Sequence, residues 1–273
     1  MTILVTGATG KVGRHIVSQL QQANHHVRAL TRNSEQANFP AGVEVVSGDL
    51  ASPAAIAEAF QGVTGLHLIT FNGDAYTPLN SASEIIELAK KAGVQRITVL
   101  CGPEESVVEQ AVKASGIDWT MLHPVEFMGN AIWDWGYSIR EAGIVKEPFP
   151  HALSAKVHEA DIAAVAVTAL LNEGHAGKSY VLTGPEALTR VESFRILSEA
   201  LGRDIPFIEL TEDEARDQWR AEGYGEEDIA FFIEMGANTP EIGFTVLPTI
   251  EEVTGRPART FAQWAAEHVQ AFN

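Results

Sequence analysis

Three glycines near the start of the chain have a spacing that suits phosphate binding. Gly7, Gly10 and Gly13 follow a β-rich run at residues 3–6 and precede a helical pattern. In such a turn the first glycine permits a tight bend, the second lets the backbone approach a pyrophosphate, and the third lets the helix pack on the strand. The helix N-terminus adds amide groups and a favourable dipole. We therefore expect a dinucleotide to bind along the turn, which consists of Gly7, Ala8, Thr9, Gly10, Lys11, Val12 and Gly13.

The end of the second predicted strand, residues 27–31, indicates which dinucleotide binds. An acidic residue there would accept a hydrogen bond from the ribose 2′-hydroxyl and repel a 2′-phosphate. The sequence instead has Arg32, which can bind a phosphate through two hydrogen bonds, and Lys11 in the turn could add a second positive charge. The pattern favours NADP(H) over NAD(H). The alternative is a surface arginine with no ligand.

Two further strand ends should border the same ligand, because ligands of open α/β sheets bind outside the carboxyl ends of the strands. After the strand at residues 43–47, Asp49 can accept a hydrogen bond from the adenine amino group, and Leu50 can pack on the ring. Asp49 can equally be a simple helix N-terminal acid. After the strand at residues 66–70, we expect Thr70, Phe71 and Asn72 to border the ribose and nicotinamide.

The elements that must position these residues alternate between strand and helix. Such alternation requires right-handed crossovers and a parallel sheet covered on both faces. The predicted fold is therefore α/β, a Rossmann-type doubly wound parallel sheet. Strands are expected at residues 3–6, 27–31, 43–47, 66–70, 97–100, 120–122 and 178–182, and helices at 11–22, 53–60, 81–92, 105–115, 159–172 and 191–201.

The second half of the chain is less regular and mostly helical beyond residue 211. We expect one NAD(P)-binding domain over residues 1–273. Its small, mostly helical C-terminal lobe should cover the substrate and be formed mainly by residues 127–157 and 185–273.

Composition excludes several classes of function. The net charge of −17 argues against nucleic-acid binding, which needs clustered lysine and arginine. No apolar run approaches the length of a membrane span, about 18 to 20 residues. Cys101 is the only cysteine, and His25 and His26 have no third ligand in view, so no metal site is expected. The composition is typical of a cytoplasmic protein, and the oligomeric state cannot be predicted.

The motifs together resemble the NmrA-like group of atypical short-chain dehydrogenase/reductases, which includes NADPH-dependent quinone reductases and redox-sensing regulators. The matching segments are residues 6–13, 28–33, 48–50, 114–120, 123–130, 184–189 and 260–265. The resemblance implies that Pro124, Phe127 and Asn130 enclose the nicotinamide end and begin the substrate pocket. This chain departs from the family at His123, where arginine is common.

The catalytic pair of ordinary short-chain dehydrogenases is missing. In those enzymes a lysine four residues after a tyrosine lowers the tyrosine pKa. Here the residues four positions after Tyr76, Tyr137, Tyr180 and Tyr224 are Asn80, Glu141, Gly184 and Asp228. The helix at 105–115, which should carry the pair, has Glu105 and Glu109 in their place. NmrA-like proteins also generally lack the pair.

The substrate should therefore need little acid catalysis, as a quinone or a polycyclic aromatic carbonyl compound does, because hydride addition gives a delocalised oxyanion. His123 is the candidate proton donor, with Asn72 and Asn130 as alternative hydrogen-bond donors to the oxyanion. Two other functions remain open. One is a non-catalytic NADP(H)-binding redox sensor, and the other is an unusual oxygenase or isomerase on the same fold.

An aromatic-rich stretch follows the nicotinamide-side motif and could line a pocket for a flat aromatic substrate. Its candidate substrate contacts are Phe127, Met128, Asn130, Trp133 and Tyr137. The same pattern also fits the core of a lobe helix. Cys101, which ends a predicted strand near the expected crevice, is interpreted as a packed thiol rather than a redox sensor.

Overall fold

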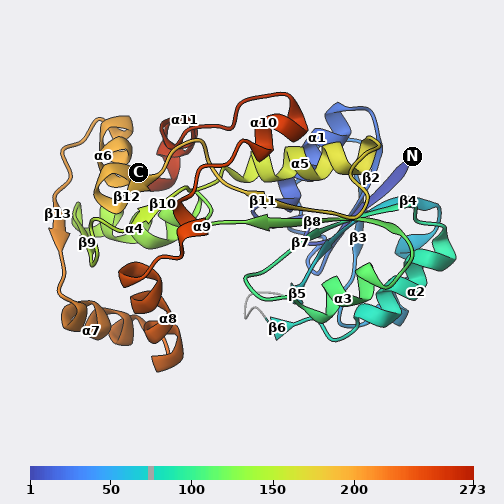
Figure 1. The fold of residues 1–273 in the computed structure, drawn as a ribbon, viewed down its shortest axis with the longest axis horizontal. Helices are drawn as coiled ribbons and strands as arrows, with labels where there is room; N and C mark the ends of the chain where they lie inside the picture. The colour runs from blue at the N-terminus through green and yellow to red at the C-terminus, as the bar shows by residue number, and fades with distance from the viewer. Residues whose placement is uncertain (73–76) are drawn as a thin grey trace. The chain divides into compact units, whose positions relative to one another are not determined.

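The computed structural model describes residues 1–72 and 77–273 and contains the predicted parallel sheet (Figure 1). Seven strands pair in the order β11-β8-β7-β4-β1-β2-β3, and every neighbouring pair is parallel. Their bounds are Thr2–Val5 (β1), His26–Thr31 (β2), Glu44–Ser47 (β3), Val63–Ile69 (β4), Arg96–Leu100 (β7), Asp118–Pro124 (β8) and Lys178–Leu182 (β11). The predicted fold class is confirmed.

Helices cover both faces of this sheet. On one face α1 (Gly13–Gln22) packs against α5 (Glu159–Leu171), which also contacts α10 (Thr249–Thr254). On the other face α2 (Ala82–Ala92) contacts α3 (Val107–Lys113) and the 3-10 helix η1 (Pro53–Phe60). A buried apolar cluster on this second face joins the strands to these three elements. The sheet is therefore doubly wound, as the alternating pattern predicted.

Several elements differ from their predicted form or bounds, among them β4, which begins at Val63 instead of residue 66, and α3, which is shorter than the predicted 105–115. Residues 53–60 form a 3-10 helix, whereas an ordinary helix was expected. Strand β8 runs from Asp118 to Pro124, longer than the predicted 120–122, because it pairs with β7 on one side and β11 on the other. As a result, His123 and Pro124 lie within the strand.

The chain divides into two compact units. Unit 1 contains residues 1–124, 159–182 and 249–255, and therefore the whole seven-stranded sheet. Unit 2 contains residues 125–158, 183–248 and 256–273. The sequence grouping into residues 127–157 and 185–273 differs from this division mainly at α10, which packs on α5 in unit 1.

Unit 2 is mostly helical, as expected for the C-terminal lobe, and has its own core. Buried aromatic side chains fill the core, including Trp135, Phe194, Phe261, Trp264 and Phe272. Two short strand pairs complete the unit: β9 (Val145–Glu147) with β13 (Phe207–Glu209), and β10 (Leu153–Ser154) with β12 (Leu188–Thr189). Its helices are α4 (Asn130–Ala142), α6 (Arg190–Leu201), α7 (Glu212–Glu222), α8 (Glu226–Ala237), α9 (Glu241–Phe244), α11 (Phe261–His268) and the 3-10 helix η2 (Val269–Phe272).

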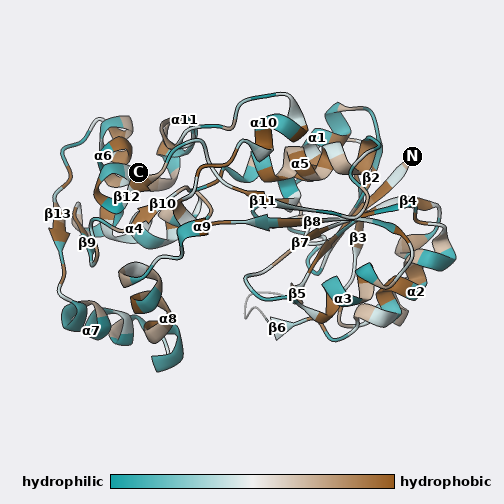
Figure 2. Cartoon of the chain, in the orientation of Figure 1, coloured by the Kyte–Doolittle hydropathy of each residue, from teal (hydrophilic) through white to brown (hydrophobic). Residues whose placement is uncertain are grey.

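Hydropathy follows this arrangement. Figure 2 shows the central strands as largely hydrophobic and α7 as largely hydrophilic. Three acidic residues, Glu212, Asp213 and Glu214, form the first turn of α7. Within the described ranges 1–72 and 77–273, no helix combines the length and the apolar character needed to cross a membrane.

Candidate cofactor and active site

The glycine turn has the geometry that a pyrophosphate requires. Gly7 adopts a left-handed conformation with φ +57°, and the Gly10 amide donates to the Gly7 carbonyl at 2.9 Å. A Cβ on Gly13 would lie 2.1 Å from the Gly7 oxygen, so only glycine lets α1 start this close to the turn. The amides of Arg14, His15 and Ile16 in the first turn of α1 donate to the Gly10 and Val12 carbonyls, so the helix contributes mainly the positive end of its dipole. The turn therefore fits the phosphates of a dinucleotide.

The end of β2 is connected to this turn. The hydroxyl oxygens of Thr9 and Thr31 are 3.4 Å apart, and the Asn33 amide donates to the Thr31 hydroxyl at 3.3 Å. Arg32 lies between these residues and is exposed. A guanidinium at this position suits a 2′-phosphate on a ribose bound beside the turn.

Asp49 and Leu50, which follow β3, make contacts within the protein. One Asp49 carboxylate oxygen accepts a hydrogen bond from the Ala51 amide at 2.8 Å, and the Asp49 carbonyl accepts one from the Ser52 amide at 2.9 Å. Leu50 belongs to the apolar core and is 6% exposed. These are contacts of a helix start, and the contact of both residues with adenine stays a prediction.

The end of β4 brings three predicted residues to the same sheet edge. The buried Thr70 hydroxyl donates to the Leu100 carbonyl at 3.4 Å. Phe71 and Asn72 are half-buried and form the short strand β5 (Phe71–Asn72), which pairs with β6 (Thr77–Pro78). Tyr76, one of the four tyrosines considered above, lies outside the described residues.

A cluster of three polar side chains that the sequence alone did not predict lies at the ends of β7 and β8. One potential ligand atom each from Cys101, Glu109 and His123 lies within 4.8 Å of the other two. Cys101 follows β7, His123 lies near the end of β8, and Glu109 is in the first turn of α3. The spacing of Ser106 and Glu109 is typical of a capping box at a helix N-terminus and could have predicted the start of α3. It could not have predicted that the Glu109 carboxylate lies beside His123.

The predicted substrate residues of unit 2 occupy different environments. Phe127 forms an isolated bridge with Val157, whereas Met128 is completely buried in the unit 2 core and has no surface open to a ligand. Trp133 and Tyr137 are 74% and 72% exposed on α4. The remaining substrate candidate, Asn130, begins α4, whereas Pro124, expected beside the nicotinamide, ends β8 in unit 1.

Unit 2 also contains a cluster of charged side chains that was not predicted from the sequence. Lys156 donates to Glu126 at 2.9 Å, and Arg190 donates to Glu147 at 2.7 Å. Burial raises the pKa of Glu147, and the Arg190 charge opposes that shift. Together with Asp134 and Trp135 these four side chains enclose a cavity of about 20 Å³, the size of a water molecule.

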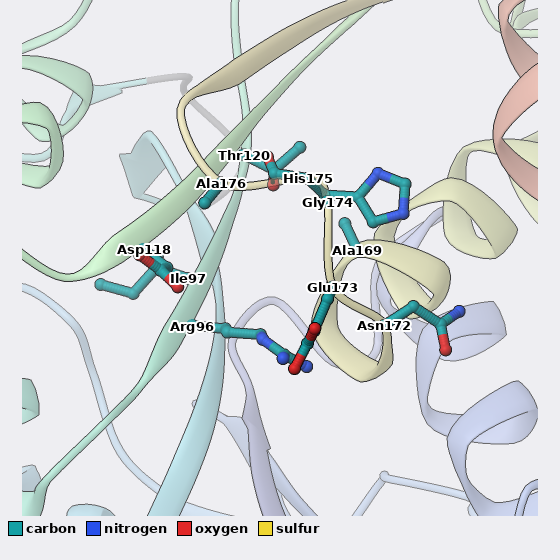
Figure 3. Close-up of a pocket in the computed structure, with 10 residues that line it drawn as sticks. All are labelled: Arg96, Ile97, Asp118, Thr120, Ala169, Asn172, Glu173, Gly174, His175 and Ala176. Carbon is teal, nitrogen blue, oxygen red and sulfur yellow. Dashed lines mark hydrogen bonds between the residues drawn. The ribbon is translucent and has the colours of Figure 1, made fainter.

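A larger cavity lies at the amino-terminal ends of the sheet strands β7 and β8 (Figure 3). Its volume is about 280 Å³, and it is bounded by Arg96 and Asp118, which begin β7 and β8, and by the loop after α5. The glycine turn follows the carboxyl end of β1. Because all seven strands are parallel, this cavity is at the edge opposite the turn and is not the cofactor site.

Comparison with known proteins agrees with this geometry. Residues 7–106 match a family model described as NAD(P)H-binding. The chain is 38% identical to a (4-alkanoyl-5-oxo-2,5-dihydrofuran-3-yl)methyl phosphate reductase of Streptomyces griseus, over 99% of both chains. It is 34% identical to an NAD(P)H azoreductase of Xenophilus azovorans, again over 99% of both chains.

Solved structures of similar proteins include an NADPH-dependent quinone oxidoreductase from Escherichia coli. That structure is 25% identical, with a TM-score of 0.77, and the match covers 98% of this chain and 99% of the other. Fold, glycine turn and relatives define an NAD(P)H-dependent oxidoreductase. The chain belongs to the NmrA-like family of atypical short-chain dehydrogenase/reductases.

Proposed function

We propose that this protein is an NADPH-dependent reductase of a quinone or a polycyclic aromatic carbonyl compound. The observation that carries the proposal is the position of His123, a half-buried imidazole at the carboxyl edge of the sheet. Ligands of this fold bind at that edge, so an imidazole there can reach a substrate oxygen. Two relatives, an azoreductase and a quinone oxidoreductase, are named for conjugated acceptors.

NADPH rather than NADH is proposed as the cofactor because of Arg32. The residue follows the strand end that the Thr9–Thr31 contact ties to the glycine turn. An arginine there attracts a 2′-phosphate, where an acid would repel it. Bound NADPH would supply the hydride, and the turn and strand ends would hold it in orientation.

The proton is assigned to His123. Hydride addition to a quinone gives a hydroquinone monoanion, whose charge is delocalised over the ring. An imidazolium at His123 then donates its N–H proton to the oxyanion and becomes neutral imidazole. Because the anion is already stabilised by delocalisation, weak acid assistance is enough, and orientation of the reactants supplies most of the acceleration. Asn72 is proposed as a hydrogen-bond donor to the same oxygen.

A second candidate substrate is a conjugated lactone. The relative with 38% identity over 99% of both chains is named for a dihydrofuranone phosphate. In an unsaturated lactone of this kind, hydride would add to the β-carbon and the resulting enolate would take a proton. The same imidazole could supply that proton.

A panel of acceptors under anaerobic conditions tests the proposal. The acceptors are a naphthoquinone, a polycyclic aromatic ketone, an unsaturated butyrolactone, an azo dye and a simple aliphatic ketone. We expect the highest kcat/KM with a conjugated acceptor and no detectable NADPH oxidation with the aliphatic ketone. A preference for the aliphatic ketone would contradict the proposal, and preference for the lactone would select the second candidate.

A further inference from the structure

Three side chains from separate elements meet at the carboxyl ends of β7 and β8. They are Cys101, Glu109 and His123, with one polar atom of each within 4.8 Å of the other two. Cys101 and Glu109 are buried, and His123 is half-buried. The cluster therefore has a buried side and a side that is partly open.

The strand register explains why Cys101 and His123 face α3. Val99 of β7 and Met121 of β8 are paired neighbours, and both belong to the apolar cluster on the α3 face. Side chains alternate along a strand, so the residues two positions later point to the same face. The Cys101 amide donates to the Leu122 carbonyl at 2.9 Å, which extends the pairing to these two positions.

The cap of α3 holds Glu109 on the buried side. One oxygen of its carboxylate accepts hydrogen bonds from the amide and the hydroxyl of Ser106, each at 3.1 Å. The side chain is 1% exposed and lies in the first turn, where the helix dipole stabilises a negative charge. The Ser106 contacts use one oxygen of the carboxylate, and a carboxylate oxygen lies within 4.8 Å of a ligand atom of Cys101 and of His123.

Cys101 does not compete with the histidine as an acid. Burial, together with the charge of Glu109 and a hydrogen bond to it, raises the pKa of the thiol far above its usual range. The thiol therefore stays protonated, and its sulfur lies 3.6 Å from the Val99 carbonyl oxygen. Lys113 also acts on the cluster by its charge, but its ammonium is paired with Glu105.

We propose that Glu109 is a positioning residue for His123, and that the two together take the place of the absent tyrosine–lysine pair, with His123 as the proton donor. The Glu109 carboxylate accepts the N–H of the nearer ring nitrogen and thereby fixes the imidazole tautomer and ring orientation. The other ring nitrogen then points away from α3 and carries the proton that goes to the substrate oxyanion. After that transfer the imidazole is neutral, keeps its N–H toward Glu109, and regains a proton from water. The catalytic part of this inference rests on the proposed reductase activity.

The same three residue types could also bind zinc, with a thiolate, a carboxylate and an imidazole as ligands. A protonated thiol and a carboxylate already engaged by Ser106 favour the hydrogen-bonded arrangement. Metal content is therefore one outcome of the test.

Nitrogen-15 NMR of the imidazole reports the tautomer without any turnover. In the wild type we expect neutral His123 to show a single tautomer. Glu109→Gln should mix the two tautomers and lower kcat by roughly 10- to 100-fold, with KM for NADPH changed less than twofold, because only the general acid is disturbed. Ser106→Ala is the matched control, since it removes the cap contact but keeps the carboxylate. It should lower Tm while the tautomer is retained.

A mixture of tautomers in the wild type would overturn the proposal, and this result needs no variant to fold. An unchanged tautomer in Glu109→Gln, or stoichiometric zinc in the purified protein, would overturn it as well. A single Glu109-dependent tautomer in a protein that turns over none of the acceptors would support the pairing and reject the reductase assignment. Failure of the Glu109–His123 pairing can thus be distinguished from failure of the reductase assignment.

Discussion

The hydroxyl oxygens of Thr9 and Thr31 lie 3.4 Å apart and connect the glycine turn after β1 with the end of β2. Thr9 belongs to the segment that should contact the pyrophosphate, and Thr31 directly precedes Arg32. A dinucleotide held by the turn would therefore bring its adenosine ribose toward the end of β2, as in other Rossmann folds. This relationship makes the cofactor preference testable at one residue.

Arg32→Ala should reduce the preference for NADPH over NADH. The guanidinium is expected to form charge-assisted hydrogen bonds with the 2′-phosphate, so its removal should shrink the affinity gap by about 1–3 kcal/mol. Calorimetric titration with both cofactors measures this gap. Arg195→Ala, which removes an exposed arginine of unit 2, is the control. Equal affinities in the wild-type protein would exclude the NADPH assignment.

Gly10→Val should abolish cofactor binding without unfolding the protein. A Cβ on Gly10 would meet the Gly7 oxygen at 3.1 Å, a tight contact that a small backbone shift can relieve, but the branched side chain would occupy the space of the pyrophosphate. Gly13→Ala should instead lower Tm, because its Cβ would lie 2.1 Å from the same oxygen. Circular dichroism and calorimetry separate the two effects. Normal NADPH binding by a folded Gly10→Val protein would place the phosphate site elsewhere.

The fold could be predicted from the sequence because its signals are local. The glycine spacing and the alternation of strand and helix each lie within a few residues, and all seven predicted strands are present in the sheet. Strand lengths were less accessible. The length of β8 depends on pairing with both β7 and β11, and the positions of these neighbours are not encoded in the local pattern.

The site was harder to predict because its members come from different elements. His123 was identified as the candidate proton donor, but its proximity to Glu109 depends on the strand register and on the packing of α3. In α4 the sequence could not separate ligand contacts from core residues. Trp135 is 3% exposed and Trp133 is 74% exposed, although both belong to the same aromatic stretch. Helical periodicity distinguishes them only once the buried face is known.

His123→Ala should lower kcat by roughly 100-fold or less with a quinone acceptor. A delocalised oxyanion can take its proton from water, so loss of the imidazole slows the reaction without stopping it. Steady-state kinetics at saturating NADPH measure the effect, and His26→Ala, which changes an exposed histidine at the start of β2, is the control. An unchanged kcat would remove His123 from the mechanism.

His67 should make the protein less stable at acidic pH. Burial lowers the pKa of this β4 side chain to about 3, while its Nδ1 is 2.9 Å from the Thr98 hydroxyl. Between pH 6.5 and about 3 the unfolded chain binds a proton there that the folded chain does not. Above pH 6.5 His67 therefore does not lower the free energy of unfolding. Below that pH its effect lowers the free energy of unfolding by about 1.4 kcal/mol per pH unit, the value for one proton.

The paired substitution His67→Leu with Thr98→Val removes both partners of that hydrogen bond. We expect its free energy of unfolding to fall less between pH 7 and pH 5 than that of the wild type, as measured by urea denaturation. His26→Leu is the control and should leave the slope unchanged. A double variant with the wild-type pH slope would show that His67 does not cause the acid sensitivity.

The most direct test of the reductase assignment is anaerobic stopped-flow measurement of NADPH oxidation with a naphthoquinone acceptor. The nicotinamide absorbance reports the cofactor, and product analysis reports the hydroquinone. We predict that one hydroquinone forms for each NADPH consumed, at a rate that exceeds the uncatalysed reaction and is lost in Gly10→Val. Tight NADPH binding with no oxidation by this or any other conjugated acceptor would contradict the account and favour a redox sensor. Consumption of NADPH only in the presence of oxygen would contradict it in favour of an oxygenase.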